Sequence, residues 1–285
     1  MPTSAISGGV NSPSRFTFAG SAKISPHISA GYLIEIAVGS PDDQLIAGSL
    51  DQLAVRHNAL WIETAIGKTW LGHTSTATDS IVEINLVEQV NLAALPIASW
   101  TGFDGGRSQV LKHESPVFGG FSVSASWSDG ATTSEAWDAA LRYHNEFQGF
   151  RVAAGIGHAD NGAGVNRLSG SASVMHVASG IFLTGQAGRI DGGAKIVGGT
   201  GGISKNWTGF GATSVFAEWA KGDDVTATIS PLGLVGIGPI PELKVMGFGI
   251  VQTFDAAALD LFLDYRQIDV GPTVDVVMAG ARIRW

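Results

Sequence analysis

Apolar and polar residues alternate along most of this 285-residue chain, and few stretches have the spacing of an amphipathic helix. In residues 15–24 (RFTFAGSAKI), Phe16 and Phe18 share one phase of the alternation, whereas Thr17 and Lys23 share the other. Successive side chains of a β-strand point to opposite faces of its sheet, so alternation of this kind predicts a strand with two unlike faces. The sequence therefore predicts an all-β, antiparallel protein.

Fifteen segments carry the alternating pattern, and short links alternate with longer ones between them. The stronger candidates for strands are residues 15–24, 30–38, 54–63, 67–74, 121–127, 136–144, 150–157, 169–177, 181–188, 213–220, 244–252, 258–266 and 274–285. The weaker candidates are residues 109–115 and 203–210. The longer links are residues 40–52, 75–108, 128–135, 158–168, 189–202, 221–243 and 267–273. Short turns at one end and long loops at the other are typical of outer-membrane β-barrels.

The two faces of the expected strands differ in an unusual way. One face carries mainly Ser, Thr, Gly and Ala with an occasional charged residue, whereas the polar face of a soluble sandwich is richly charged. The other face is apolar and ends in aromatic residues, which membrane–water interfaces favour because their rings are apolar and their tips can stay hydrated. These aromatic residues are Tyr32, Trp61, Trp70, Trp127, Trp137, Tyr143, Trp219, Tyr265 and Trp285.

Composition supports the same interpretation. Hydrophobic residues make up 45% of the chain and charged residues 15%, against about 25% charged in an average soluble domain. No uninterrupted run of about 18 apolar residues predicts a transmembrane helix, and 39 glycines disfavour helices in general. The absence of cysteine excludes disulfides and thiolate metal sites. A net charge of −8 argues against nucleic acid as a partner.

Six stretches of the sequence share residues with one known family. They are SRFTFAGSAKISPHISAGYLIEI, GSLDQLAVRHNALWIETAIGKTWLGHTSTATDSIVEINL, ESPVFGGFSVSASW, FRVAAGIGH, GFGIVQTFDAAALDLFLDYR and VDVVMAGARIRW. Together they resemble the porins of alphaproteobacteria, of the general diffusion kind. The resemblance implies a sixteen-stranded transmembrane barrel that forms a homotrimer in the outer membrane and lets small hydrophilic solutes and ions diffuse through a water-filled channel. It implies no enzymatic activity and no cofactor, and its partners would be outer-membrane lipids and the outer-membrane assembly machinery.

In the family, one long loop folds into the barrel and narrows the channel, and residues 75–108 are the matching link here. The acidic candidates for this constriction are Asp79, Glu83, Glu88 and Asp104. The family places a basic wall opposite the loop, and the basic residues in the inward phase of the strands are Arg15, Lys23, Arg56, Arg142, Arg151, Arg282 and Arg284. Opposite charges that face each other across water would orient polar solutes.

The two ends of the chain add further expectations. The first residues lack both the basic leader and the apolar core of a signal peptide. The family's first strand is also not visible, so we expect a truncated start, with residues 1–13 as a remnant of the first external loop and the whole chain as one barrel domain. Trp285 stands where the family has a terminal aromatic residue that resembles the signal read by the assembly machinery.

Other interpretations remain open from the sequence. A substrate-specific channel would need an aromatic ladder in the lumen, for which Trp100 and Phe103 are the candidates. A barrel enzyme would need a Ser/His/acid set or paired acids at one rim, and no such set stands out, which leaves a structural barrel as a further alternative. A soluble all-β binding protein is opposed by the apolar outer face.

Two weaker signals complete the sequence. GGTGG (198–202) has neither the spacing of a phosphate-binding loop nor a helical pattern after it, so we expect it to lie in a flexible external loop. The histidines show no metal-binding spacing, so we expect no metal site.

Overall fold

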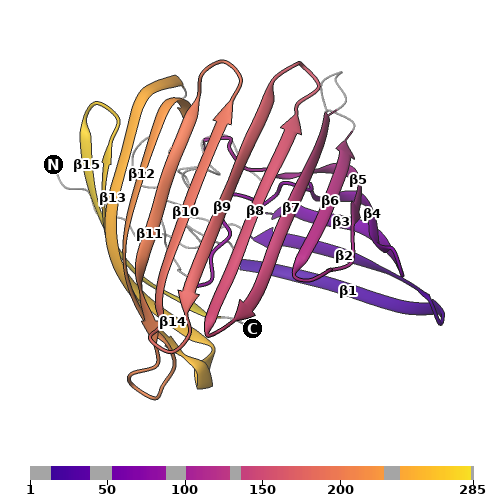
Figure 1. Cartoon of the computed structure of the whole chain (residues 1–285), viewed down its shortest axis with the longest axis horizontal. Coiled ribbons are helices and arrows are strands. Elements are labelled where there is room, and N and C mark those ends of the chain that lie inside the picture. Colours follow the sequence, from indigo (N-terminus) through magenta and orange to yellow (C-terminus); the bar gives the residue numbers. More distant parts are fainter. Residues whose placement is uncertain (1–13, 39–52, 88–100, 129–135, 228–237, 284–285) are drawn as a thin grey trace.

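The computed structural model describes residues 14–38, 53–87, 101–128, 136–227 and 238–283 as one fifteen-stranded antiparallel sheet, in which each strand pairs with the next one along the chain (Figure 1). The strands are β1 Ser14–Ser25, β2 Ile28–Val38, β3 Leu53–Thr64, β4 Gly67–Ser75, β5 Arg107–Glu114, β6 Phe121–Ser128, β7 Ala136–Phe147, β8 Phe150–Asp160, β9 Asn166–His176, β10 Ile181–Ile190, β11 Lys195–Lys205, β12 Thr213–Ala227, β13 Gly238–Phe254, β14 Leu259–Asp269 and β15 Thr273–Ile283. One 3₁₀ turn, η1 Asp255–Ala257, joins β13 to β14. The predicted all-β antiparallel class is confirmed.

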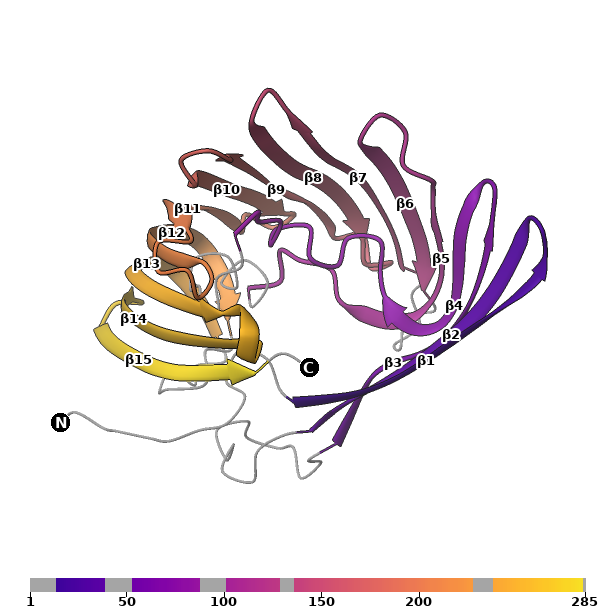
Figure 2. The same ribbon diagram turned by 90° about the horizontal axis from the view of Figure 1, so that it is seen from below.

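The sheet curls around a concave side, and Figure 2 shows the chain between β4 and β5 running through the space that it encloses. β1 and β15 form the two edges of the sheet, and no pairing joins them within the described residues. In that same part of the chain, no helix has the length and apolar character needed to cross a bilayer. In the part of the chain that the structure describes, the architecture therefore places one inward segment inside a wall of strands.

Neighbouring residues of a strand experience opposite environments. On β10, Leu183 is 63% exposed, whereas Phe182 beside it is 2% exposed. The same contrast recurs along β9, where Val174 is exposed and Ser173 is buried. A convex surface this rich in exposed aliphatic and aromatic side chains is unsuited to water and suited to the hydrocarbon of a membrane.

The eleventh strand differs from the prediction. Residues 189–202 were expected to form a loop and residues 203–210 a strand, but β11 occupies Lys195–Lys205 and pairs along its length with β10 and β12. The glycine-rich stretch 198–202 is therefore strand and not flexible loop. A Cβ atom at Gly202 would collide with the backbone of Val215, so the absence of a side chain allows β11 and β12 to approach closely.

Two strands on the other side of β11 are longer than expected. β12 and β13 extend into the region predicted as a loop at residues 221–243, and they pair as far as Ala227 and Gly238. Charged residues and a proline interrupt the alternation of apolar and polar residues in KGDDV and PELKV. The alternating pattern therefore did not predict these extensions of β12 and β13. The two strands keep one register through this region, with Asp223 opposite Glu242 and Val225 opposite Ile240, although Asp224 has a φ of 51°, in the left-handed region.

Two tryptophans lie on the face opposite to the one expected. Trp61 and Trp70 are cross-strand partners on β3 and β4, with ring centroids 6.3 Å apart. Their neighbours Leu60 and Leu71 are exposed on the convex side, so the tryptophans belong to the concave side. There the Trp70 Nε1–H donates to the Glu114 carboxylate at 2.8 Å. These two rings are therefore not part of an outer aromatic belt.

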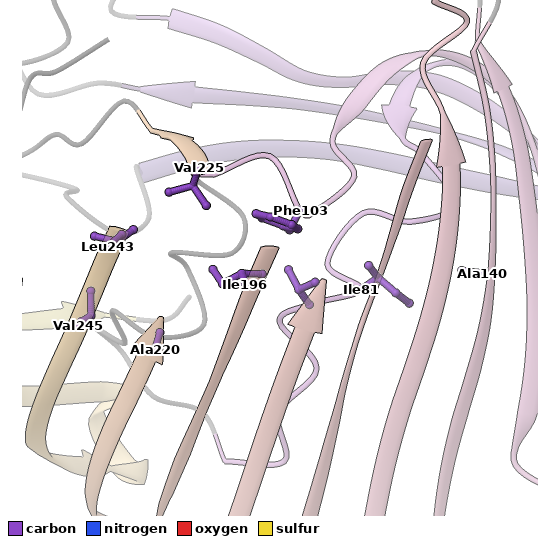
Figure 3. Packing of buried hydrophobic residues seen from close by; sticks show 9 residues of the cluster. Ile81, Phe103, Ala140, Ile196, Ala220, Val225, Leu243 and Val245 are labelled. Atoms are coloured by element: carbon purple, nitrogen blue, oxygen red, sulfur yellow. The ribbon is translucent and has the colours of Figure 1, made fainter. Parts of the chain in front are cut away.

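Buried apolar residues gather where the inward segment meets the wall (Figure 3). Ile81, Val82 and Phe103, all fully buried, come from the inward segment. The remaining members come from strands of the wall, namely Ala140, Ile196, Ala220, Val225, Leu243 and Val245. Burial of such side chains contributes about 1.5–3 kcal/mol each relative to exposure. The concave side thus has its own small core, which fixes the inward segment.

Candidate functional site

The inward segment, which we define as residues 76–87 and 101–106, leaves the wall at the end of β4 and returns at the start of β5. Its two ends are joined by hydrogen bonds from the Thr76 N–H to the Gly106 carbonyl (2.8 Å) and from the Gly105 N–H to the Thr78 carbonyl (3.1 Å). These hydrogen bonds hold the two ends of the inward segment together between the neighbouring strands β4 and β5, and we call this joined part the neck of the segment.

Asp138 on β7 is the first anchor of the inward segment. Its buried carboxylate accepts hydrogen bonds from the Thr78 N–H (2.7 Å), the Thr78 hydroxyl (2.6 Å) and the Ala77 N–H (3.2 Å). Ser126 on β6 accepts from the same Ala77 N–H at 2.9 Å and donates to Asp138 in turn. Hydrogen bonds to a charged acceptor are roughly twice as strong as neutral ones, so this contact holds the start of the segment firmly against the wall.

Two serines of β9 form the second anchor. Ser171 accepts from the Ile84 N–H at 3.0 Å and donates to the Ile81 carbonyl at 2.7 Å. Ser173 accepts from the Leu86 N–H at 3.2 Å. The main chain of the segment thus satisfies its polar groups on side chains of the wall, as a buried irregular backbone must.

Two arginines also bind the main chain of the segment. Arg142 on β7 donates to the Asp79 carbonyl at 2.9 Å, and Arg167 on β9 donates to the carbonyl groups of Gly102 and Asp104. Arg167 donates in addition to the Thr78 hydroxyl at 2.8 Å. Arg142, expected to line the constriction, therefore holds the segment in place.

Asp104 is likewise a structural residue of the segment and not an open channel charge. Only 5% of its surface is exposed, and its carboxylate accepts from the N–H groups of Ser80 (2.9 Å) and Ile81 (2.8 Å). Burial raises the pKa of the Asp104 carboxyl to about 6, although the two N–H donors favour its charged form.

Three arginines face the neck of the inward segment, and together we call them the cationic wall. They are Arg15 on β1, Arg56 on β3 and Arg107 on β5. Arg56 Nε lies 2.7 Å from a carboxylate oxygen of Glu35, and the same oxygen is 3.7 Å from an Arg15 nitrogen. Arg107 lies 3.9 Å from the Asp79 carboxylate. The structure therefore brings together two of the predicted basic residues and one predicted acid.

His57 on β3 joins this group. Its Nδ1 lies 2.9 Å from the Thr74 hydroxyl, and its Nε2 accepts from the Arg107 Nε–H at 3.4 Å. The ring thereby links β3 to the start of β5. Among the described residues, no group of three or more His, Asp and Glu is placed to hold a metal ion.

The other predicted residues lie apart from this group. Lys23 is exposed on β1, Arg151 pairs with Glu146 at 2.7 Å, and Arg282 pairs with Asp260 at 2.8 Å. Glu83 lies on the inward segment with a half-buried side chain. Glu88, Trp100, Arg284 and Trp285 lie outside the described residues. Phe103, a candidate for an aromatic ladder, is fully buried in the core of the concave side.

Several residues of the site were missed in the sequence. Glu35 and Asp138 lie in the inward phase of two strands that were predicted, so their position in the alternation could have identified them as residues of the site. Arg107 falls just before the expected strand 109–115, and Arg167 falls just before 169–177. The ends of strands are the least certain part of a prediction from sequence patterns. Both arginines lie at such ends, so neither was recognised as a residue of the site.

Comparisons with known proteins were made for the sequence and for the fold. A family model described as Gram-negative porin matches residues 2–274. No curated protein sequence matches the chain.

Solved structures with a similar fold share little sequence with this chain. An anion-selective porin from Comamonas acidovorans is 17% identical, with a TM-score of 0.64 over 95% of this chain and 84% of that one. OmpT of Vibrio cholerae, in its trimer form, is 13% identical, with a TM-score of 0.60 over 94% and 87%. A variant of the porin of Rh. blastica is 13% identical, with a TM-score of 0.58 over 94% and 89%.

Proposed function

The chain belongs to the family of Gram-negative porins, and from that premise we propose that the inward segment and the cationic wall form the narrowest part of its channel. As a member of the family it is an outer-membrane channel protein for passive diffusion and not an enzyme. We propose specific residues that determine the width of that channel and the electric field inside it. The solutes are small, hydrophilic molecules and ions.

One observation carries the proposal: the inward segment is bound to the wall at several points by side chains of β6, β7 and β9. Ser126, Asp138 and Ser171 bind its main chain at successive positions. A segment held this way keeps a fixed distance from the opposite side of the channel. Such rigidity is what a size filter needs, because a loose loop would give a variable aperture.

Charge supplies the second property of the constriction. Arg15, Arg56 and Arg107 approach it from three strands, with Glu35 and Asp79 among them. Interleaved charges of both signs across water create a transverse field, which favours polar solutes over apolar ones. Glu83 and Glu88 belong to the same proposed constriction, within a loop at residues 75–108 of a single-domain barrel. We place Lys23, Arg151, Arg282 and Arg284 on the lumen outside its narrowest part.

Size exclusion of polymers in planar bilayers tests the constriction. We expect the purified chain to give discrete current steps that polyethylene glycol above a threshold size no longer reduces. Ser171→Ala with Ser173→Ala removes acceptors for the Ile84 and Leu86 N–H groups, so this double variant should admit larger polymers. Ser122→Ala is the matched control, because Ser122 faces inward on β6 and makes no hydrogen bond to the described part of the inward segment. An unchanged threshold in the double variant would contradict a constriction set by this segment.

The family also supports assembly beyond one chain. We propose a homotrimer, since the structurally similar OmpT of Vibrio cholerae was solved as a trimer. We further propose that outer-membrane lipids surround it and that the assembly machinery reads Trp285. Native mass spectrometry should show three copies per particle. Trp285→Ala should lower the amount of protein inserted in the outer membrane without changing the conductance of the chain refolded in detergent.

A further inference from the structure

Two tryptophan rings and four charged side chains form one patch on the concave side of β3, β4 and β5. The register of the three strands brings these side chains together in two rows. The first row is Trp61, Trp70 and Lys112, and the second row, nearer to residues 65–66, is Glu63, Lys68 and Glu114. We call the two rows together the tryptophan platform.

The tryptophan platform lies towards the periplasmic end of the channel. Its second row is next to residues 65–66, the short link between β3 and β4. Short turns are periplasmic in outer-membrane barrels. Trp61 follows Arg56 of the cationic wall by five positions on β3, which is ~16 Å at about 3.3 Å per residue. A solute therefore meets the platform and the cationic wall at different depths of the channel.

Both indole rings are held against the wall of strands. A Cβ atom at Gly31, the cross-strand partner of Trp61 on β2, would collide with the Trp61 ring, so this ring lies across bare backbone. The Trp70 Nε1–H donates to the Glu114 carboxylate at 2.8 Å, which fixes the second ring. The planes of the two rings are inclined by 55°. Both side chains are half-buried, so each presents apolar surface to the water of the channel.

Tryptophan on this side of the sheet is not explained by the membrane. Rings of an outer aromatic belt are stabilised by the membrane–water interface, whereas these two rings face the concave side. Exposed apolar surface that is rimmed by polar groups marks binding sites. The tryptophan platform has both parts of such a surface, because its rings are flanked by charged side chains.

The charges of the tryptophan platform balance one another. Lys68 Nζ lies 3.1 Å from a Glu63 carboxylate oxygen, and Lys112 Nζ lies 3.1 Å from a Glu114 carboxylate oxygen. Lys68 Nζ also lies 4.4 Å from the centre of the Trp61 ring, which is a favourable position for a cation. Two cations and two anions give the platform no net charge.

The charged groups keep hydrogen-bonding capacity for a solute. An ammonium group has three donors, and a carboxylate has about four acceptor sites. The contacts within the platform use only part of this capacity. The side chains of Glu63 and Glu114 are 50% and 40% exposed, so a solute in the channel can reach their oxygens.

This combination favours a neutral saccharide over an ion. An organic cation would meet the Lys68 ammonium that already lies over the Trp61 ring, and an organic anion would meet two carboxylates. A pyranose ring has apolar C–H faces that can pack on an indole ring. Its hydroxyl groups can donate to the carboxylates and accept from the Lys68 ammonium.

We propose that the tryptophan platform binds pyranose rings of neutral saccharides as they pass through the channel. The site rests on the proposed function, since the concave side must be the channel, but it uses none of the residues assigned to the constriction. Binding in a channel has to be weak enough for the solute to leave again. The site therefore works at millimolar concentrations of saccharide.

Single-channel recording in planar bilayers tests the site, with the neutral trisaccharide maltotriose as the probe. We expect maltotriose to reduce the current with a saturable dependence on concentration and to add current noise as single molecules bind and leave. Polyethylene glycol of similar mass is the control for a solute without pyranose rings, and it should reduce the current without saturation. Saturable block by benzoate and none by maltotriose would overturn the proposal in favour of an anion site.

Variants of the two rings connect the block to the tryptophan platform. Trp61→Ala and Trp70→Ala should each raise the half-blocking concentration of maltotriose by about 5-fold or more, because apolar contact is lost. Trp70→Phe keeps an aromatic ring and should stay within about 2-fold of the wild type. Trp219→Ala is the matched control, because Trp219 is exposed opposite the exposed Met246 on the convex side. An equal increase in Trp219→Ala would overturn the proposal.

Glu63→Ala tests the polar half of the site with both rings in place. The substitution removes an exposed acceptor, so it should also raise the half-blocking concentration. A half-blocking concentration that stays at the wild-type value in Glu63→Ala, Trp61→Ala and Trp70→Ala alike would overturn the proposal.

Failure of this site can be told apart from failure of the constriction. The size threshold for polyethylene glycol depends on the inward segment, so it should be unchanged in all variants of the tryptophan platform. Weaker block by maltotriose at an unchanged threshold supports a separate saccharide site. Weaker block together with a shifted threshold would place the effect on the width of the channel and would overturn the proposal.

Discussion

Asp138 accepts hydrogen bonds from both the N–H and the hydroxyl of Thr78, a residue 60 positions earlier in the chain. This contact ties a strand in the middle of the sheet to the first residues of the inward segment. It joins two parts of the sequence that neither local propensity nor alternation connects. The width of the proposed constriction therefore depends on a side chain of the wall as much as on the segment itself.

Asp138→Ala should loosen the inward segment. The substitution leaves the Thr78 N–H and hydroxyl buried without an acceptor, which costs about 1–3 kcal/mol per group. Because the strands of the wall keep their pairing, the barrel should still fold, and its single-channel current should become larger and noisier. Asp160→Asn, near the end of β8, is the control for a lost aspartate and should leave the current unchanged. A quiet, unaltered current in Asp138→Ala would count against the anchor.

Arg56→Gln should shift the ion selectivity of the channel towards cations. Arg56 contributes a positive charge beside Glu35, and two unit charges about 8 Å apart in water interact by ~0.5 kcal/mol, or a factor of about two in occupancy. Reversal potentials under a salt gradient measure the change, which should shrink at high ionic strength because salt screens the field. Arg151→Gln, on the exposed Glu146 pair, should have a smaller effect.

Asp104 should give the protein a specific pH dependence of stability. Its pKa is about 6 when folded, above the ordinary 3.8, so the folded protein binds a proton in a range where the unfolded chain does not. The cost of burying the charged carboxylate is therefore present above pH 6, and it is relieved as the pH falls from about 6 to about 4. The difference corresponds to at most ~3 kcal/mol.

Asp104→Asn isolates this contribution. Asparagine keeps one acceptor oxygen for the Ser80 and Ile81 N–H groups and does not titrate. Between pH 7 and pH 5, the wild-type free energy of unfolding in detergent should rise relative to that of Asp104→Asn. Parallel profiles for the two proteins would show that the carboxyl of Asp104 is not the group that titrates.

The sequence predicted the wall better than what lies inside it. Alternation located fourteen of the fifteen strands, because each exposes an apolar face to lipid and a polar face to the concave side. It did not predict the course of the inward segment, whose N–H groups find acceptors on Asp138, Ser171 and Ser173. It also misplaced Trp61 and Trp70, since phase alone does not say which face of a mixed strand is the outer one.

The position of strand β11, which the sequence did not predict, can be explained and tested through its glycines. Glycine has low strand propensity, and residues 198–202 include four glycines, so local preference opposes the observed pairing. The packing explains it, because a Cβ atom at Gly202 would collide with the Val215 carbonyl and the Phe216 backbone.

Gly202→Ala should therefore destabilise the barrel by about 1–3 kcal/mol through overpacking. Gly185→Ala, on the neighbouring strand β10, meets open space and should be neutral or slightly stabilising, because alanine restricts the unfolded chain more than glycine does. Urea unfolding in detergent compares the two variants with the wild type. If Gly202→Ala were as stable as Gly185→Ala, close approach of β11 and β12 would not be the reason for glycine at position 202. The strand would then owe its place to pairing of the backbone alone.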